Sequence, residues 1–250
     1  MSFRSRTRSV GAFYIPGFPR GVKWLLISNV AIFIVGYFLQ LLHLDRPLAY
    51  LALTPVDVVK YFSVWQLVTY AFLHGGFGHI IWNMLALWMF GADIERVWGT
   101  RRFVQFYFFC AVGAGLCVVL LNYILPWGNP AIATIGSSGA IFGILMVYAI
   151  LFADREILWG FLIPIKVKYF VMIIGAVAFL SSFGVNTGVS NFAHLGGLLF
   201  GYLYLKTPQI QFDPVAPLRR QYSEWKLQRA KKKFQVYLRK QGPGPGSKMN

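Results

Sequence analysis

Three short stretches of the sequence hold polar side chains that could carry out acyl transfer. Ser138 lies in the small-residue stretch 136–139, His194 lies within an apolar stretch, and His79 precedes Asn83 by one helical turn in another. A serine hydroxyl is a weak nucleophile, and a neighbouring imidazole is the usual base that activates it. The sequence therefore predicts a catalytic dyad of Ser138 and His194. For the oxyanion of the tetrahedral intermediate, the predicted donors are the His79 and Asn83 side chains and the Ser138 backbone N–H.

No carboxylate is available as a third member of this set. The stretches that contain Ser138 and His194 hold no acidic residue, and the acids on the predicted outer side, Asp45 and Asp57, lie in a long loop. A histidine held by its surroundings is therefore expected in place of a triad. Metal binding is a weaker alternative because a third ligand is missing. We expect no metal and no cofactor.

Each candidate also has a purely structural interpretation. Ser138 among glycines could permit close helix contact, as small residues do in membranes. His194 could be a hydrogen-bonded structural histidine, and His79 with Asn83 could bridge helices. Gly197 and Gly201 have the four-residue spacing of a tight helix contact, and for these two we favour a structural role over chemistry.

The composition predicts an all-α polytopic membrane protein. Of the 250 residues, 57% are hydrophobic and 13% charged, whereas soluble domains carry about a quarter charged residues. Six apolar stretches could span or nearly span a bilayer, which takes roughly 20 residues. Between the first two, residues 43–76 predict a partly embedded loop with a short helix. The six predicted spans are 22–42, 77–97, 103–125, 137–152, 167–184 and 190–206.

Lys and Arg are distributed very unevenly along the chain. Of 24, 22 fall in the N-terminal segment, in the loops after the second and fourth spans, or in the C-terminal region. This bias predicts that both termini are cytoplasmic. The second, fourth and sixth spans then all run inward from the outer surface. His79, Ser138 and His194, each near the start of one of these spans, are therefore expected at a common depth, which favours chemistry over three separate structural roles.

Three regions are predicted: a basic N-terminal segment (1–21), a membrane domain (22–206) and a basic C-terminal tail (207–250). Aromatic and basic residues alternate in the tail, which predicts contact with anionic lipid headgroups; we expect no nucleic acid partner. Within the third span, Cys110 and Cys117 share one helix face. They lie too far apart along it for a disulfide, and we interpret them as small core residues.

The motifs resemble those of the rhomboid family of intramembrane serine proteases. Gly136-x-Ser138-Gly139 resembles the family's nucleophile motif, and the stretch 193–201 resembles its sixth helix, where the histidine is the base. The pattern His74, His79, Asn83 resembles its second helix, which supplies oxyanion contacts. Phe142 matches a position where an aromatic ring stacks on the base.

The resemblance implies a six-helix bundle with a re-entrant first loop and a cavity open to the outside. It also implies that the chain cleaves single-pass membrane proteins near the outer end of their spans. The chain departs from the family at Trp65-Gln66, where many members have Trp-Arg and the arginine helps to hold the first loop. The short N-terminal segment suits a bacterial inner membrane.

Two other functions remain open from the sequence. The chain could be a rhomboid-like protein that binds membrane clients without cutting them, which the unusual Gln66 keeps open. It could also be a small transporter that moves protons through intramembrane histidines. A transporter is less favoured because the polar groups lie near one surface and the sequence shows no duplication.

Overall fold

The computed structural model describes residues 17–159, 163–182, 191–207, 229 and 231. The chain divides into two compact units, residues 1–209 and 210–250. The predicted membrane domain falls within the first unit. Most of the predicted N-terminal segment and nearly all of the predicted lipid-binding tail lie outside the described residues, so both remain predictions.

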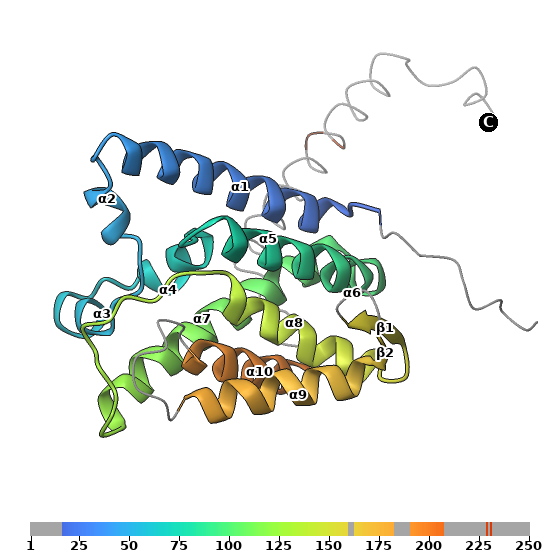
Figure 1. Ribbon diagram of the computed structural model, residues 1–250. Helices are drawn as coiled ribbons and strands as arrows, with labels where there is room; N and C mark the ends of the chain where they lie inside the picture. Colours follow the sequence, from blue (N-terminus) through green and yellow to red (C-terminus); the bar gives the residue numbers. More distant parts are fainter. Residues whose placement is uncertain (1–16, 160–162, 183–190, 208–228, 230, 232–250) are drawn as a thin grey trace, which may run out of the picture. The chain divides into compact units, whose positions relative to one another are not determined.

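Each of the six predicted spans contains helix (Figure 1). The second is formed by α5, a π-helical turn η2 and α6, which follow one another without a break. Only α1 and α7 are, among the described residues, both long and apolar enough to cross a bilayer, so the count of six spans remains a prediction. The helices are α1 (Arg20–Leu41), α5 (Phe77–Ala86), η2 (Leu87–Gly91), α6 (Ala92–Trp98), α7 (Thr100–Ile124), α8 (Ser138–Leu151), α9 (Val167–Ser181) and α10 (Asn191–Lys206).

The loop between α1 and α5 holds more helix than predicted. Four short helices replace the single one expected: α2 (Arg46–Ala49), α3 (Pro55–Tyr61), α4 (Gln66–Thr69) and the 3₁₀ turn η1 (Tyr70–Phe72). Prolines lie in the first turn of α2 and of α3, where a missing N–H costs no intrahelical hydrogen bond. Leu53 pairs with Thr134, and this bridge ties the loop to the segment that leads into α8.

A small antiparallel hairpin corrects the all-α prediction. β1 (Glu156–Trp159) pairs with β2 (Ile163–Lys166) between α8 and α9, where the sequence predicted only a loop. The strands are four residues long and β2 contains Pro164, which weakens a strand pattern in the sequence. The first unit is therefore mostly helical with one short sheet.

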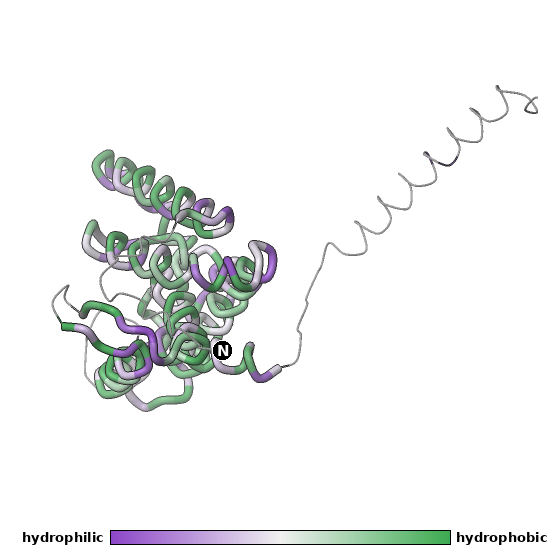
Figure 2. Tube along the Cα trace, turned by 90° about the vertical axis from the view of Figure 1, so that its right-hand side faces the viewer, coloured by the Kyte–Doolittle hydropathy of each residue, from purple (hydrophilic) through white to green (hydrophobic). Residues whose placement is uncertain are grey.

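The helices present apolar side chains outward as well as inward. On α1, Trp24, Val35 and Phe38 are exposed, and Met172 and Leu180 are exposed on α9. Figure 2 shows that hydrophobic residues dominate along the helices of this unit. Apolar surface of this extent on a single chain is what a lipid environment accommodates.

Helices α8 and α10 touch backbone to backbone through facing glycines. A Cβ placed on Gly197 would be 2.0 Å from the Gly139 carbonyl oxygen, and one on Gly201 would be 2.6 Å from that of Gly143. The predicted structural role of Gly197 and Gly201 is therefore confirmed. This contact also fixes the distance between the start of α8 and the start of α10.

We expect Gly197→Ala to lower the free energy of unfolding by about 1–3 kcal/mol, because the added methyl group must push the two backbones apart. Thermal unfolding in detergent would measure the loss. Gly78→Ala is the matched control, since a Cβ at Gly78 meets no atom within 4 Å. If Gly197→Ala and the wild type unfold at the same temperature, helices α8 and α10 are less closely packed at Gly197 than described.

Both cysteines are free and lie on the face of α7 that meets α8 and α10. A Cβ on Gly143 would approach the Cys110 sulfur to 2.5 Å, and one on Gly196 would approach the Cys117 sulfur to 3.0 Å. The prediction of small packing residues on a shared helix face is confirmed.

Gln66 holds the first loop together through three hydrogen bonds. Its side chain is 1% exposed. The Thr54 N–H donates to its Oε1 at 3.0 Å, and its Nε2 donates to the Tyr50 carbonyl and to Asp57 Oδ2, both at 3.4 Å. A glutamine therefore ties the loop at the position where the family resemblance led us to expect an arginine.

Gln66→Ala is expected to lower the free energy of unfolding by about 1–3 kcal/mol, because it removes all three hydrogen bonds of a buried carboxamide. The midpoint of thermal unfolding would report the change. Gln40→Ala, which removes an exposed glutamine of α1, serves as the control. Matching midpoints for the two variants would mean that the Gln66 hydrogen bonds do not hold the loop.

Candidate active site

The predicted dyad residues meet at the starts of two helices. Ser138 is the first residue of α8 and His194 lies in the first turn of α10. Because facing glycines bring these helices together, Ser138 Oγ lies 2.9 Å from His194 Nε2. This distance permits direct proton transfer from the hydroxyl to the imidazole.

Among the described residues, an aromatic ring and not a carboxylate holds the imidazole of His194. The Phe142 ring, one turn along α8 from Ser138, stacks on it with centroids 4.2 Å apart and planes 2° from parallel. Stacking on one side and the hydroxyl at Nε2 leave the ring little freedom to turn. Phe142 thus restrains the His194 ring, a role for which the nearby sequence offers no acidic side chain.

His79 borders the same space as Ser138. Gly136 lies between them with φ of +120°, a conformation that favours glycine. A Cβ there would be 2.7 Å from His79 Nε2 and 3.8 Å from Ser138 Oγ. The Gly75 N–H faces His79 Nδ1 at 3.4 Å, so that Nδ1 accepts and the neutral ring carries its proton on Nε2. Nε2–H can then donate toward the site.

Two further donors lie in this region. The Asn83 side chain is buried, and its Nδ2 has no hydrogen-bond partner in the described residues. The Ser138 N–H, in the first turn of α8, has no intrahelical acceptor. An uncommitted buried donor is uncommon and normally has a specific cause.

The other predicted residues lie around Ser138, the candidate nucleophile. A Cβ on Gly139 would lie 2.7 Å from the Ala114 Cβ, so only glycine fits at this helix contact. His74 Nε2 lies 3.3 Å from Ser137 Oγ, and its ring packs edge to face on His79 at 5.1 Å. The sequence analysis missed Ser137, although its position next to Ser138 could have drawn attention to it.

Tyr70 is a second residue that the sequence analysis missed. Its carbonyl accepts the Gly136 N–H at 2.9 Å, and its hydroxyl donates to the Ala111 carbonyl at 2.8 Å. These bonds link the first loop, the turn at Gly136 that precedes Ser138, and α7. In the described part of the chain, no group of three or more His, Cys, Asp or Glu side chains is placed to hold a metal ion.

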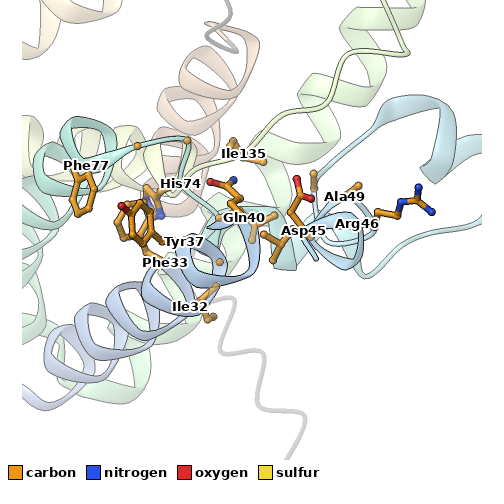
Figure 3. A pocket seen from close by; sticks show the side chains of 16 residues that line it. Ile32, Phe33, Tyr37, Gln40, Asp45, Arg46, Ala49, His74, Phe77 and Ile135 are labelled. Atoms are coloured by element: carbon orange, nitrogen blue, oxygen red, sulfur yellow. The ribbon is translucent and has the colours of Figure 1, made fainter. Parts of the chain in front are cut away.

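A cavity of about 590 Å³ opens beside this site, between α1, α2 and the turn before α5. Figure 3 shows Phe33 and Tyr37 of α1 close to His74, and Asp45 further along the cavity. Ile135, from the segment before the nucleophile turn, also lines the cavity. The lining thus includes His74 but none of Ser138, His79 and His194, and its polar side chains include Gln40, Asp45 and Arg46.

Comparisons with known proteins agree with these motifs. The family model described as "Rhomboid domain" matches residues 61–207. The chain is 34% identical over 141 residues to "Rhomboid protease GluP" of Bacillus subtilis, covering 55% of this chain and 25% of that protein. It is 28% identical over 179 residues to "Rhomboid protease GlpG" of Serratia proteamaculans (72% and 60%).

A eukaryotic protein, "Rhomboid-like protease 3" of Toxoplasma gondii, is 26% identical over 187 residues, which cover 73% of this chain and 66% of that protein. The chain thus spans less than two thirds of the length of the relatives it matches. The domain match covers more than half of the chain and includes the stretches with Ser138, His79 and His194. The chain is an integral membrane protein that belongs to the rhomboid family.

Proposed function

We propose that the protein is an intramembrane serine endopeptidase. The observation that carries the proposal is the 2.9 Å separation of Ser138 Oγ and His194 Nε2 at the starts of two apolar helices. Relatives whose names describe rhomboid proteases support the same activity.

In the proposed mechanism, His194 Nε2 takes the proton of Ser138 as Oγ attacks the scissile carbonyl carbon. The negative charge that develops on the carbonyl oxygen is stabilised by the Ser138 N–H, His79 Nε2–H and Asn83 Nδ2–H. When the intermediate collapses, the C–N bond breaks and His194 gives its proton to the leaving amine. Water then attacks the ester, again losing a proton to His194, which returns it to Ser138 Oγ.

The proposed substrates are single-pass membrane proteins, cut near the outer end of their spans. The space beside Gly76, where an added Cβ meets no atom within 4 Å and which borders the cavity, is the proposed entry for an unwound substrate segment. The proposal includes six spans, cytoplasmic termini, a bacterial inner membrane and contact of the tail with anionic lipids. The distribution of Lys and Arg supports this orientation.

A rhomboid-like protein that binds clients without cutting them is the alternative class. Such a protein has no need for a serine hydroxyl within hydrogen-bond distance of an imidazole that is stacked on an aromatic ring. The pairing of Ser138 with His194, and of His194 with Phe142, favours the protease.

A fluorophosphonate probe tests the proposal, because it labels only a serine that a base activates. We expect purified wild-type protein in detergent to be labelled and Ser138→Ala and His194→Ala to remain unlabelled. A known rhomboid protease, labelled in parallel, controls for the conditions. An unlabelled but folded wild type would favour the client-binding class.

A further inference from the structure

The two faces of the β1–β2 sheet differ in polarity. Side chains alternate between the faces of a sheet along each strand, so Ile157, Ile163 and Ile165 share one face, which we call the isoleucine face. The residues on the opposite face are Glu156, Leu158, Pro164 and Lys166. Glu156 and Lys166 pair across the strands at the end of the sheet nearest the helices. One face is thus apolar throughout its described side chains, whereas the other carries charge.

The isoleucine face extends from the protein core to the outside. Ile157 is half-buried and packs against the core. Ile163, at the other end of the sheet, is 60% exposed. Figure 2 shows the sheet projecting beside the helices, with hydrophobic residues toward its outer end. The same face therefore meets protein at one end and is largely uncovered at the other, and none of its residues has a role in the proposed mechanism.

The sheet is fixed to the helices through Arg155, the residue before β1. Its guanidinium forms an ion pair with Asp93 of α6. Its Nη1 also donates to the Tyr148 hydroxyl of α8 at 2.7 Å, and that hydroxyl donates to Asp93 Oδ2 at 3.0 Å. The Val167 N–H, at the start of α9, donates to the Arg155 carbonyl at 2.9 Å. Because α6, α8 and α9 all hold Arg155, the projecting end of the sheet has a defined position.

The sheet lies where the lipid-facing surface of α9 begins, because α9 follows β2 directly (Figure 1). Tyr169, Met172 and Ile173 are exposed on α9. In an integral membrane protein, exposed apolar side chains of this extent face lipid. The uncovered part of the isoleucine face continues this surface, which indicates that lipid also covers Ile163.

The backbone of the sheet limits how deep it lies in the bilayer. The sheet has two strands, so each strand leaves one edge of N–H and C=O groups unpaired within it. Open edges do not occur in contact with the hydrocarbon core, where nothing satisfies these groups. Among lipid headgroups water satisfies them, and apolar side chains there reach about 5–10 Å into the boundary with the acyl chains. The headgroup layer is therefore the depth at which both the backbone and the isoleucine face are satisfied.

We propose that the β1–β2 sheet is a fixed interfacial anchor that lies flat in the headgroup layer of the bilayer. Its isoleucine face points to the acyl chains, and Ile163 is the side chain that contacts them beyond the edge of the helices. Glu156 and Lys166, on the opposite face, stay among headgroups and water. The orientation proposed above places the anchor in the cytoplasmic leaflet. The depth of the sheet depends neither on that orientation nor on protease activity.

Spin labels on the full chain, in liposomes of phosphatidylcholine and phosphatidylglycerol, test the depth of the sheet. Cys110 and Cys117 are first replaced by Ala, and the label is then placed on Ile163→Cys. Collisions of the label with oxygen, which concentrates among acyl chains, are compared with its collisions with a water-soluble nickel chelate. We expect the label at Ile163 to favour oxygen and to lie about 5–10 Å below the phosphates.

Two other label positions serve as controls. Pro164→Cys is the matched one, because Pro164 is adjacent, exposed and on the opposite face, and we expect its label to favour the nickel chelate. Met172→Cys, on α9, gives the response of a lipid-facing position. A label at Ile163 that favours the nickel chelate, or that matches the label at Pro164, would overturn the anchor. A label shielded from both reagents would overturn it as well, because protein, such as a second copy of this chain, would then cover the face.

Arg155→Gln, combined with Ile163→Cys, tests whether the sheet is fixed. Without the guanidinium the ion pair to Asp93 is lost, so we expect faster motion of the label and a smaller preference for oxygen. Arg102→Gln is the control, because Arg102 lies over the Trp98 ring, 4.5 Å from its centroid, and we expect label motion as in the parent chain. Equal label motion in the two variants would show that Arg155 does not fix the sheet.

Discussion

Ser138→Ala and His194→Ala are each expected to lower kcat/KM for a transmembrane substrate by about 10⁴-fold or more. Without the hydroxyl, no acyl-enzyme can form. Without the imidazole, Ser138 Oγ loses His194 Nε2, which lies 2.9 Å away and is the only proton acceptor found for it among the described residues. Because the two residues act as a unit, the double variant should lose no more activity than either single variant.

Both losses are measured by cleavage of a fluorescent transmembrane substrate in proteoliposomes, alongside the midpoint of thermal unfolding. Two variants control for the residue types. Ser28→Ala removes a hydroxyl bonded only to carbonyls of its own helix, those of Trp24 and Leu25. His43→Asn changes a histidine with φ of +54°, a conformation that asparagine tolerates. Cleavage by folded Ser138→Ala at the rate of Ser28→Ala would exclude the dyad.

The positions of the site residues could be predicted because each depends on where an apolar stretch begins. His79, Ser138 and His194 were expected near the starts of three helices, and they lie in the first turns of α5, α8 and α10. The glycines that set the distance between α8 and α10 were also visible, because close helix contacts have a four-residue spacing. Local sequence thus predicted which residues could meet.

Contacts between a side chain and distant backbone could not be predicted in this way. Glu95 accepts the backbone N–H groups of Gly21 and Val22, both at 2.7 Å, and the Thr100 hydroxyl at 2.6 Å. A carboxylate at the start of α1 is favourable because N–H groups there have no intrahelical acceptor. Nothing in the sequence near Glu95 indicates that its two backbone partners, Gly21 and Val22, lie more than 70 residues away.

The same reason explains Gln66 and the hairpin. Gln66 stands out in the sequence only as a departure from the arginine of the family, and only the folded loop brings its partners, from Tyr50 to Asp57, around one buried carboxamide. The two-stranded sheet depends on pairing of Glu156 with Lys166, a register that two strands of four residues do not specify by pattern.

Among the residues that the structure describes, the proposed oxyanion site has one unpaired donor, Asn83 Nδ2, and its presence gives the second prediction. Asn83→Leu is expected to lower kcat/KM by about 10²–10³-fold, the usual cost of removing one oxyanion donor. Most of this loss should fall on kcat, because the donor is used only when charge develops on the substrate oxygen. Initial cleavage rates over a range of substrate concentrations would separate kcat from KM.

Stability should change in the opposite direction from activity. Asn83 Nδ2 is buried and has no partner in the described part of the chain, so replacing it with an apolar group removes a desolvation cost and breaks no hydrogen bond found for that nitrogen. We therefore expect Asn83→Leu to unfold at the wild-type temperature or above it. Asn122→Leu is the control for the direction of the change in unfolding temperature. Asn122 donates to the Val118 carbonyl and accepts the Asn129 N–H, so its replacement should lower the midpoint of thermal unfolding.

These two measurements distinguish an oxyanion donor from a structural asparagine. A structural asparagine would lose stability when replaced, and activity would fall only as far as the folded fraction falls. A buried donor that is used only in the transition state lowers the stability of the resting protein. The same donor lowers the activation barrier of peptide-bond cleavage. A less stable Asn83→Leu with near-wild-type kcat would therefore remove Asn83 from the proposed oxyanion site and leave His79 and the Ser138 N–H as its donors.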